Sequence, residues 1–252
     1  MQEIMLDGFG NYLCQKIIER MNSEQVKTTI AQLSVYLPEI CLNNHGTRAV
    51  QALIEASRDD PEKIVAFLNS IQVNMYDIIL DIHGNHVIQS CISQFSSELT
   101  APIFNVISAN CFAIATHKHG CCVLQRFFEY GSTTQKESAQ QLLLHSLSEL
   151  IEDPFGNYLV QNVIKLRGKR AIMQIVRYLC ADLAYFARQK FSSNVVERVL
   201  EFADGEGRAL IFQSVGLQEA ALLLCDQFGN YVVQKMLALA DEHAFARLVS
   251  EM

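Results

Sequence analysis

The chain has 252 residues, of which half are apolar, and a formal net charge of −7. No stretch reaches the roughly 18 uncharged apolar residues that a membrane span needs, and the acidic first residues do not resemble a secretion leader. The acidic balance also lacks the overall basic excess that is common in nucleic-acid binders. These properties predict a soluble protein of the cytoplasm.

Taken in chain order, the sequence repeats one nine-residue motif seven times. The copies read DGFGNYLCQ from Asp7, NNHGTRAVQ from Asn43, DIHGNHVIQ from Asp81, HKHGCCVLQ from His117, DPFGNYLVQ from Asp153, QKFSSNVVE from Gln189 and DQFGNYVVQ from Asp226. We take the fifth residue of each motif as its first place, so that the spacings between copies are 36, 38, 36, 36, 36 and 37 residues. This period is typical of a solenoid, in which each unit buries its apolar face against its neighbours.

The segments around the motifs have helical patterns, and no strand-like alternation of any length occurs. An Asp or Asn opens five copies, a residue typical of a turn or of a helix N-cap, and a glycine precedes the first place in six. Helices are expected between motifs over Ser23–Leu33, Pro61–Ile71 and Thr134–Leu147, with a loop around Ser70–Asn74 and a last helix over Asp241–Met252. We therefore predict one all-α repeat domain over residues 1–252, built from about seven three-helix repeats.

On a helix, the apolar residues of each copy fall at the third, fourth, seventh and eighth places, which share one arc. In the first copy these are Leu13, Cys14, Ile17 and Ile18. Cys14 and Cys91 lie on this arc, which favours reduced thiols used as small apolar residues over disulfides. The first, second and fifth places fill the opposite arc, and we expect all three to be exposed.

These polar places can read bases. An Asn and a Gln one turn apart offer paired amide donors and acceptors, enough for the Watson–Crick edge of a base. In the sixth copy Glu197 replaces the Gln beside Ser193, and a pure acceptor suits the two donors of guanine. The second place is Tyr, Arg or His in five copies, and these side chains can stack on a base at about 1–3 kcal/mol each. The sixth place is basic in four copies, which indicates a basic stripe along the same side.

Other interpretations start from the same residues. The polar places could be the solvated face of a scaffold that binds peptides, as in HEAT or armadillo arrays. His117, His119, Cys121 and Cys122 invite a zinc site, but they follow the repeat register and have no second ligand pair at finger spacing. His45, His83 and His119 stand where other copies have Phe, so packing explains them. No catalytic set lies outside the repeats, so we predict neither an enzyme nor a cofactor or metal.

The motifs FGNYLCQ, HGNHVIQ, FGNYLVQ, FSSNVVE and FGNYVVQ resemble the Pumilio (PUF) family of RNA-binding domains over nearly the whole chain. The resemblance implies a right-handed crescent of three-helix repeats that binds single-stranded RNA on its concave face, with the C-terminal repeat at the 5′ base. Family domains usually have eight repeats, and here the N-terminal one is missing. Two further departures are Thr47, where Cys or Ser is usual, and Cys122, which replaces a stacking side chain.

The resemblance also implies a role for each place. Base edges would be read by the first and fifth places: Asn11, Gln15, Thr47, Gln51, Asn85, Gln89, Cys121, Gln125, Asn157, Gln161, Ser193, Glu197, Asn230 and Gln234. Bases would stack on the second places: Tyr12, Arg48, His86, Cys122, Tyr158, Asn194 and Tyr231. Weak contacts to the RNA backbone would come from the basic sixth places: Lys16, Arg126, Arg198 and Lys235.

The implied code gives the target 5′-UGUAUAU-3′, read in mRNA 3′ untranslated regions by a monomer. The implied consequence is mRNA decay or translational repression, through deadenylation or translation-repression proteins. The alternatives are a scaffold for protein interactions or a nucleolar PUF-like protein of low specificity.

Overall fold

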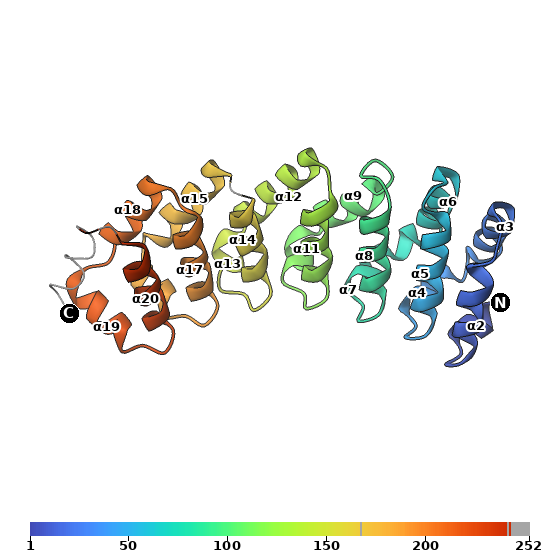
Figure 1. The fold of residues 1–252 in the computed structure, drawn as a ribbon, viewed down its shortest axis with the longest axis horizontal. Coiled ribbons are helices and arrows are strands. Elements are labelled where there is room, and N and C mark those ends of the chain that lie inside the picture. The colour runs from blue at the N-terminus through green and yellow to red at the C-terminus, as the bar shows by residue number, and fades with distance from the viewer. Residues whose placement is uncertain (167, 241, 243–252) are drawn as a thin grey trace. The chain divides into compact units, whose positions relative to one another are not determined.

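The computed structural model describes residues 1–166, 168–240 and 242. All regular structure in this part of the chain is helical, as predicted, and it divides into two compact units, Met1–Leu142 and Leu143–Met252. Within each unit the chain repeats the order short helix, motif helix, outer helix (Figure 1). We call the helices that carry the repeated motif the motif helices.

The first unit holds four repeats. Its short helices are α1 (Gln2–Leu6), α4 (Leu37–Leu42), α7 (Met75–Leu80) and α10 (Cys111–Ala115). Its motif helices are α2 (Gly10–Ile18), α5 (Gly46–Ser57), α8 (Gly84–Gln94) and α11 (Gly120–Tyr130). The outer helices are α3 (Ser23–Leu33), α6 (Pro61–Ile71), α9 (Ala101–Ala109) and α12 (Thr133–His145), the last of which runs across the boundary between the units.

The second unit holds the remaining three motif helices. Its short helices are α13 (Leu147–Leu150), α16 (Leu183–Ala187) and α19 (Leu217–Leu224). Its motif helices are α14 (Gly156–Lys165), α17 (Ser192–Phe202) and α20 (Gly229–Leu239), and its outer helices are α15 (Lys169–Leu179) and α18 (Gly205–Gln213). Among the described helices, none has the combined length and apolar character that crossing a membrane requires.

The expected helix bounds hold for α3 and α6, and two other expectations change. The predicted helix Thr134–Leu147 ends at His145, and a new helix begins at Leu147. The predicted loop around Ser70–Asn74 is the end of α6 followed by a 3₁₀ helix, η1 (Gln72–Asn74). The last predicted helix, Asp241–Met252, falls almost entirely outside the described residues.

The apolar arc of each motif helix forms the core. In the first unit α2 packs against α5, α5 against α8 and α8 against α11, and in the second α14 packs against α17 and α17 against α20 (Figure 1). Val87, Ile88 and Cys91 on α8 are fully buried, as are Val195 and Val196 on α17. None of the eight cysteines forms a disulfide, and burial raises the pKa of Cys91 well above its ordinary value.

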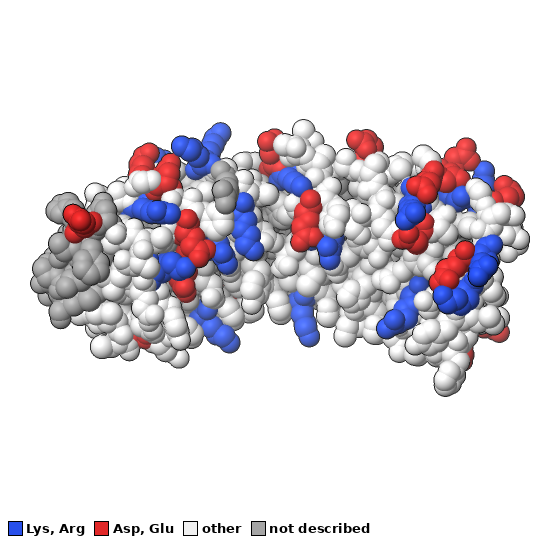
Figure 2. Space-filling view, in the orientation of Figure 1, with Lys and Arg blue, Asp and Glu red and all other residues white. Residues whose placement is uncertain are grey.

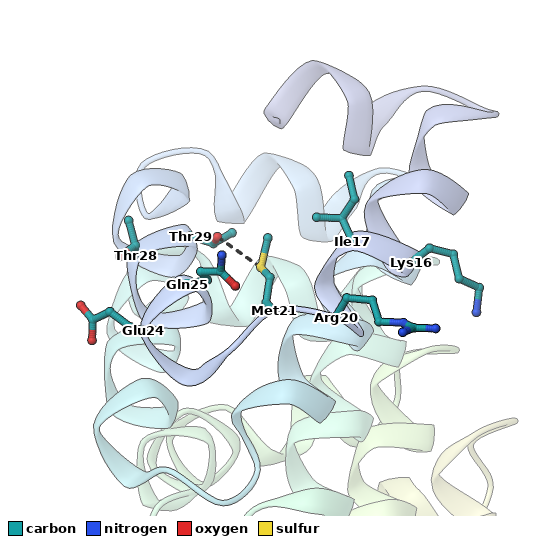
Figure 3. A pocket seen from close by; sticks show the side chains of 8 residues that line it. All are labelled: Lys16, Ile17, Arg20, Met21, Glu24, Gln25, Thr28 and Thr29. Carbon is teal, nitrogen blue, oxygen red and sulfur yellow. Dashed lines mark hydrogen bonds between the residues drawn. The ribbon is translucent and has the colours of Figure 1, made fainter.

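The apolar arc is only half covered in the first copy, contrary to expectation. Cys14 and Ile18 are 1% exposed, but Leu13 is 57% and Ile17 is 44% exposed. The described helices that pack against α2, among them α1 and α5, leave both side chains uncovered. Figure 3 shows the open hollow at this end, which Ile17 and Met21 line together with side chains of α3.

A tight loop sets the start of each motif helix. In the fifth copy, the carboxylate of Asp153 accepts hydrogen bonds from the backbone N–H groups of Phe155 at 2.8 Å and Gly156 at 2.7 Å. The carboxylates of Asp7, Asp81 and Asp226 act in the same way. Of the two predicted roles, these residues therefore form the turn ahead of the helix, whose N-cap is the residue before the glycine, Phe155 in the fifth copy. A Cβ on Gly156 would lie 2.9 Å from the backbone oxygen of Leu150, so the close approach of two backbones requires a glycine here.

Candidate nucleic-acid interface

The second places of the motif helices point outward, as predicted. Tyr12 is 60%, Tyr158 55% and Tyr231 57% exposed, although large aromatic side chains are usually covered. The other second places are exposed too: Arg48, His86, Cys122 and Asn194. Because consecutive motif helices pack side by side, the first unit presents four such side chains and the second unit three. Each unit therefore carries a face of exposed second-place side chains at the spacing of the repeat, and all but Cys122 and Asn194 are aromatic or guanidinium groups.

The first places are not exposed, and this prediction was wrong. Asn11, Asn85 and Asn157 are 1–2% exposed, Thr47 is 7% and both Cys121 and Ser193 are 4%, and Asn230 alone is half-buried. The first place is the second residue of its helix, so its side chain turns back over the preceding loop and is covered by it. The fifth places are half-buried, except for the exposed Gln234.

A chain of hydrogen bonds links loop, first place and fifth place in the Asn/Gln copies. In the fifth copy, Nδ2 of Asn157 donates to the backbone oxygens of Asp153 at 2.9 Å and Pro154 at 3.0 Å. Oδ1 of Asn157 in turn accepts from Nε2 of Gln161 at 3.1 Å. The same bonds occur in the first, third and seventh copies, through Asn11 and Gln15, Asn85 and Gln89, and Asn230 and Gln234.

This chain of bonds fixes which way the Gln amide faces. A backbone oxygen only accepts, so the Asn must direct its NH₂ group at the loop and its oxygen at the Gln. The Gln must then direct its NH₂ group at the Asn, which leaves its oxygen and one N–H for a ligand. We call this chain of bonds the amide relay.

The amide relay is missing where the first place is a small residue. Oγ1 of Thr47 donates to the backbone oxygen of Asn44 at 3.4 Å, and Sγ of Cys121 contacts that of Lys118 at 3.3 Å. The amides of Gln51 and Gln125 have no hydrogen-bond partner within the described part of the chain. Either face of these two amides can therefore be presented to a ligand.

The sixth copy is built differently. Its second-place Asn194 donates its amide N–H to the backbone oxygens of Lys190 at 3.0 Å and Phe191 at 3.4 Å, so the side chain lies over its own loop. Glu197 is half-buried, and this desolvation raises the pKa of its carboxyl group although Lys235 and Arg198 act to lower it. Gln161, Glu197, Arg198, Glu201 and Lys235 line one small hollow together with Asn194.

The basic sixth places are paired with glutamates, so they do not form the stripe of free positive charge that the sequence indicated. Lys16 lies 2.8 Å from Glu19, and Arg126 lies 2.8 Å from Glu129. Arg198 and Lys235 both contact Glu201, at 2.8 and 2.7 Å. Figure 2 shows acidic and basic side chains next to each other over α11 and α17. Sequence reasoning missed these glutamates, although three of the pairs have the i,i+3 spacing of helix ion pairs.

The residues of the rejected zinc site have structural roles. Nδ1 of His117 accepts from the backbone N–H groups of His119 and Gly120, both at 3.3 Å, and so replaces the Asp of the other copies. Within the described residues, no three His, Cys, Asp or Glu side chains are placed to hold a metal ion. His119 is partly buried, and desolvation lowers the pKa of its imidazole.

Comparison with known proteins agrees with this geometry. The profile of the Pumilio-family RNA binding repeat matches seven segments: residues 1–34, 36–66, 74–108, 110–138, 147–177, 183–215 and 221–252. The chain belongs to the Pumilio family. Each matched segment contains one motif helix, so the seven motif copies are seven Pumilio repeats.

Relatives and solved structures extend over almost the whole chain. A Pumilio domain-containing protein of Schizosaccharomyces pombe is 38% identical over 98% of the chain, and putative pumilio homolog 7 of Arabidopsis thaliana is 37% identical over 98%. The chain spans 36% and 38% of the length of these two proteins.

The similar solved structures include Pumilio-family domains with bound RNA. The Puf4 RNA-binding domain, bound to a 3′ UTR recognition sequence of the HO endonuclease RNA, matches 99% of the chain with a TM-score of 0.93 and 36% identity. This chain covers 80% of that one. The RNA-binding domain of yeast Puf5p, bound to SMX2 RNA, matches 99% of the chain with a TM-score of 0.84 and 28% identity, and 75% of it is covered.

Proposed function

We propose that the chain binds single-stranded RNA in a sequence-specific manner, one base per repeat, with 5′-UGUAUAU-3′ as its target. The second places supply surfaces on which bases stack, and the fifth places supply the hydrogen bonds that distinguish them. The supporting observation is that outward planar side chains alternate with polar fifth places along the motif helices of each unit. The first places act mainly by controlling what the fifth places present.

The amide relay supports uracil at the four Asn/Gln repeats. Uracil offers the order acceptor, donor, acceptor along its Watson–Crick edge, whereas adenine offers a donor beside an acceptor. A Gln amide pairs with either base, but the two bases require it to face opposite ways when they are held in the same pose. Because the relay holds Gln161 in one orientation, only one of these bases can match it. The family resemblance implies that this base is uracil.

The same argument assigns a base to each of the other three repeats. Gln51 and Gln125 are not held by a relay, so their amides can turn to pair with N6 and N1 of adenine. Glu197 has no donor when ionised, so it suits the N1 and N2 donors of guanine. Reading from the C-terminal repeat, the bases are U, G, U, A, U, A and U.

A binding measurement with short oligonucleotides tests the proposal. The chain should shift UGUAUAU in a gel at much lower concentrations than ACAAUAU, in which the first three bases are changed. Equal affinity for the two, or no binding to either, would refute sequence-specific recognition. Equal affinity would instead fit a low-specificity PUF-like protein, and absence of binding would fit a scaffold for protein interactions.

The proposed biological role follows from the family. We propose that the protein acts in the cytoplasm on mRNA 3′ untranslated regions, and that residues 1–252 form a single monomeric binding domain without catalysis of its own. Deadenylation or translation-repression proteins would carry out the regulatory step. The RNA bound in the Puf4 structure, which is a 3′ UTR recognition sequence, supports this assignment by similarity.

A further inference from the structure

Glu201 holds two cations that come from neighbouring motif helices. Its carboxylate contacts Arg198 of its own helix α17 at 2.8 Å and Lys235 of α20 at 2.7 Å. The hydrogen bond from Lys235 is the main cause that lowers the pKa of the Glu201 carboxyl group, and Arg198 adds to it. Glu201 is therefore ionised at neutral pH and neutralises charge on this face.

The three side chains adjoin the proposed base-reading residues. They line the same hollow as Gln161 and Glu197 (see above). Lys235 also lies one helical turn after the stacking residue Tyr231 on the same helix face. An RNA strand whose bases reach Glu197 and Tyr231 would bring its phosphates close to this ion-pair cluster.

The same pairing occurs at every basic sixth place. Lys16 and Arg126 each have a Glu three residues later, at the ninth place, and contact it. Lys235 has Ala238 at its own ninth place and instead contacts Glu201 of the preceding repeat. Where the sixth place carries no cation, the ninth place is Ser93 or Lys165 in two repeats and Glu55 in the second repeat, where Glu55 contacts Arg58. Every basic sixth place thus contacts a glutamate, although a ninth-place glutamate also occurs without a sixth-place cation.

The ion pairs of Lys16 and Arg126 are exposed and contribute little to stability, whereas the three side chains of the Glu201 cluster are only 29–35% exposed. Their effect on RNA is larger, because each cation that neutralises a phosphate releases a counterion and strengthens binding at low salt. A cation that already contacts a carboxylate must give up that contact, and the carboxylate itself repels the phosphates. We propose that Glu201 limits the electrostatic part of RNA binding at the last two repeats. This inference rests on the proposed RNA-binding function. By weakening the phosphate contacts, Glu201 would make the affinity depend more on the contacts to the bases.

Glu201→Gln tests the proposal, because it removes the charge and keeps the size of the side chain. For single strands, each added phosphate contact steepens the plot of log affinity against log salt by about 0.7, so two freed cations steepen it by up to about 1.4. At 0.1 M salt, relative to 1 M, this corresponds to an affinity gain of up to about 25-fold. UGUAUAU and the mismatched UUUAUAU should gain by similar factors, because phosphate contacts carry no sequence information.

Two matched variants control for the loss of one carboxylate. Glu129→Gln frees only Arg126 and should give a gain of about 5-fold, with a slope change of about 0.7. Glu62→Gln frees Lys27 between the outer helices α3 and α6, away from the motif helices, and should change neither affinity nor slope. Circular dichroism melts should show that all three variants fold.

The outcomes separate the two proposals. If the unmodified chain binds UGUAUAU and Glu201→Gln leaves the salt slope unchanged, the role of Glu201 is refuted and the proposed function stands. A change in the ratio of UGUAUAU to UUUAUAU affinity without a change of slope also refutes it, since Glu201 would then act through Glu197. If the unmodified chain binds no RNA, both proposals fall.

Discussion

The fifth and sixth repeats lie next to each other in the second unit. They differ in how the start of the motif helix contacts the preceding short helix. In the fifth repeat, Gly156 lets the motif helix start close to the preceding short helix. Asn157 donates to the loop carbonyls and accepts from Gln161, and so fixes the orientation of the Gln161 amide. In the sixth, Ser192 takes the glycine position, and its Oγ donates to the backbone oxygen of Phe186 at 2.7 Å. The backbone oxygen of Leu150 would clash with a Cβ at residue 156 in the fifth repeat, whereas the equivalent oxygen of Phe186 accepts a hydrogen bond in the sixth.

The difference extends to the polar face. In the sixth repeat it is Asn194, at the second place, that donates to the loop carbonyls, so no amide is available to orient the fifth place. Glu197 does not need one, because its two oxygens are equivalent acceptors. The comparison indicates that Asn157 serves to hold the Gln161 amide in one orientation, as in the other Asn/Gln repeats, whereas a carboxylate reader needs no such partner.

The largest expected effect is on stability, at the two helix starts. In Gly156→Ala the new Cβ would lie 2.8 Å from Cδ2 and 2.9 Å from the backbone oxygen of Leu150, so the backbone must shift. We expect a loss of about 1–3 kcal/mol, as for other overpacked sites. Each kcal/mol lowers the melting temperature by about 2–4 °C in a chain of this size.

Ser192→Ala is the matched control, since the sixth repeat already accommodates a Cβ. It should cost only about 1 kcal/mol, through loss of the hydrogen bond to Phe186. Equal melting temperatures for Gly156→Ala and the unmodified chain would show that the close approach is not a constraint.

The next effect is on base choice in the sixth repeat. Glu197→Gln replaces a pure acceptor with an amide, so binding to UGUAUAU should weaken by about 1–3 kcal/mol, the range for a good bidentate pair. Binding to UAUAUAU should strengthen, because an amide beside the small Ser193 is not held by a relay and can pair with adenine. Parallel titrations with the two oligonucleotides measure both changes. If the preference for G survives the substitution, Glu197 does not read the second base.

A smaller effect is expected when the amide relay of the fifth repeat is cut. Asn157→Ser removes the group that orients Gln161, so discrimination between UGUAUAU and UGAAUAU should fall by about 1 kcal/mol, the contribution of one hydrogen bond. Cys121→Asn is the reverse change, since it supplies an orienting amide beside Gln125. It should move the fourth base from A towards U. Unchanged discrimination in both variants would show that the relay does not control base choice.

Most of the framework could be predicted from the sequence. The repeat period gave the number of motif helices, and helical periodicity gave the bounds of α3 and α6 and the buried faces of the inner repeats. The outward direction of Tyr158 and Tyr231 also followed from the pattern. These features depend on spacing along the chain, which the sequence contains directly.

The sequence-based predictions were wrong where the exposure or pairing of a side chain depends on a loop or on a neighbouring helix. A helical wheel points every side chain outward from the axis, so it could not show that Asn157 turns back over the loop carbonyls. The exposure of Leu13 and Ile17 depends on which helix packs beside α2. The contact between Lys235 and Glu201 joins two motif helices and requires the distance between them, whereas the pair of Arg198 and Glu201 could have been predicted from its spacing.

The smallest expected effect is a pH dependence confined to the sixth repeat. Desolvation raises the pKa of the Glu197 carboxyl group above its ordinary value of 4.5, so this group takes up a proton at a higher pH than an exposed glutamate. Protonation turns an acceptor into a donor and removes the match to the two donors of guanine. Affinity for UGUAUAU should therefore fall as the pH drops from 7 towards 5, while affinity for UUUAUAU changes less. Glu197→Gln has no group to titrate at this place, so the ratio of its two affinities should stay constant over the same range. If the unmodified chain also keeps a constant ratio, Glu197 remains ionised throughout, and the cations held by Glu201 outweigh the effect of burial.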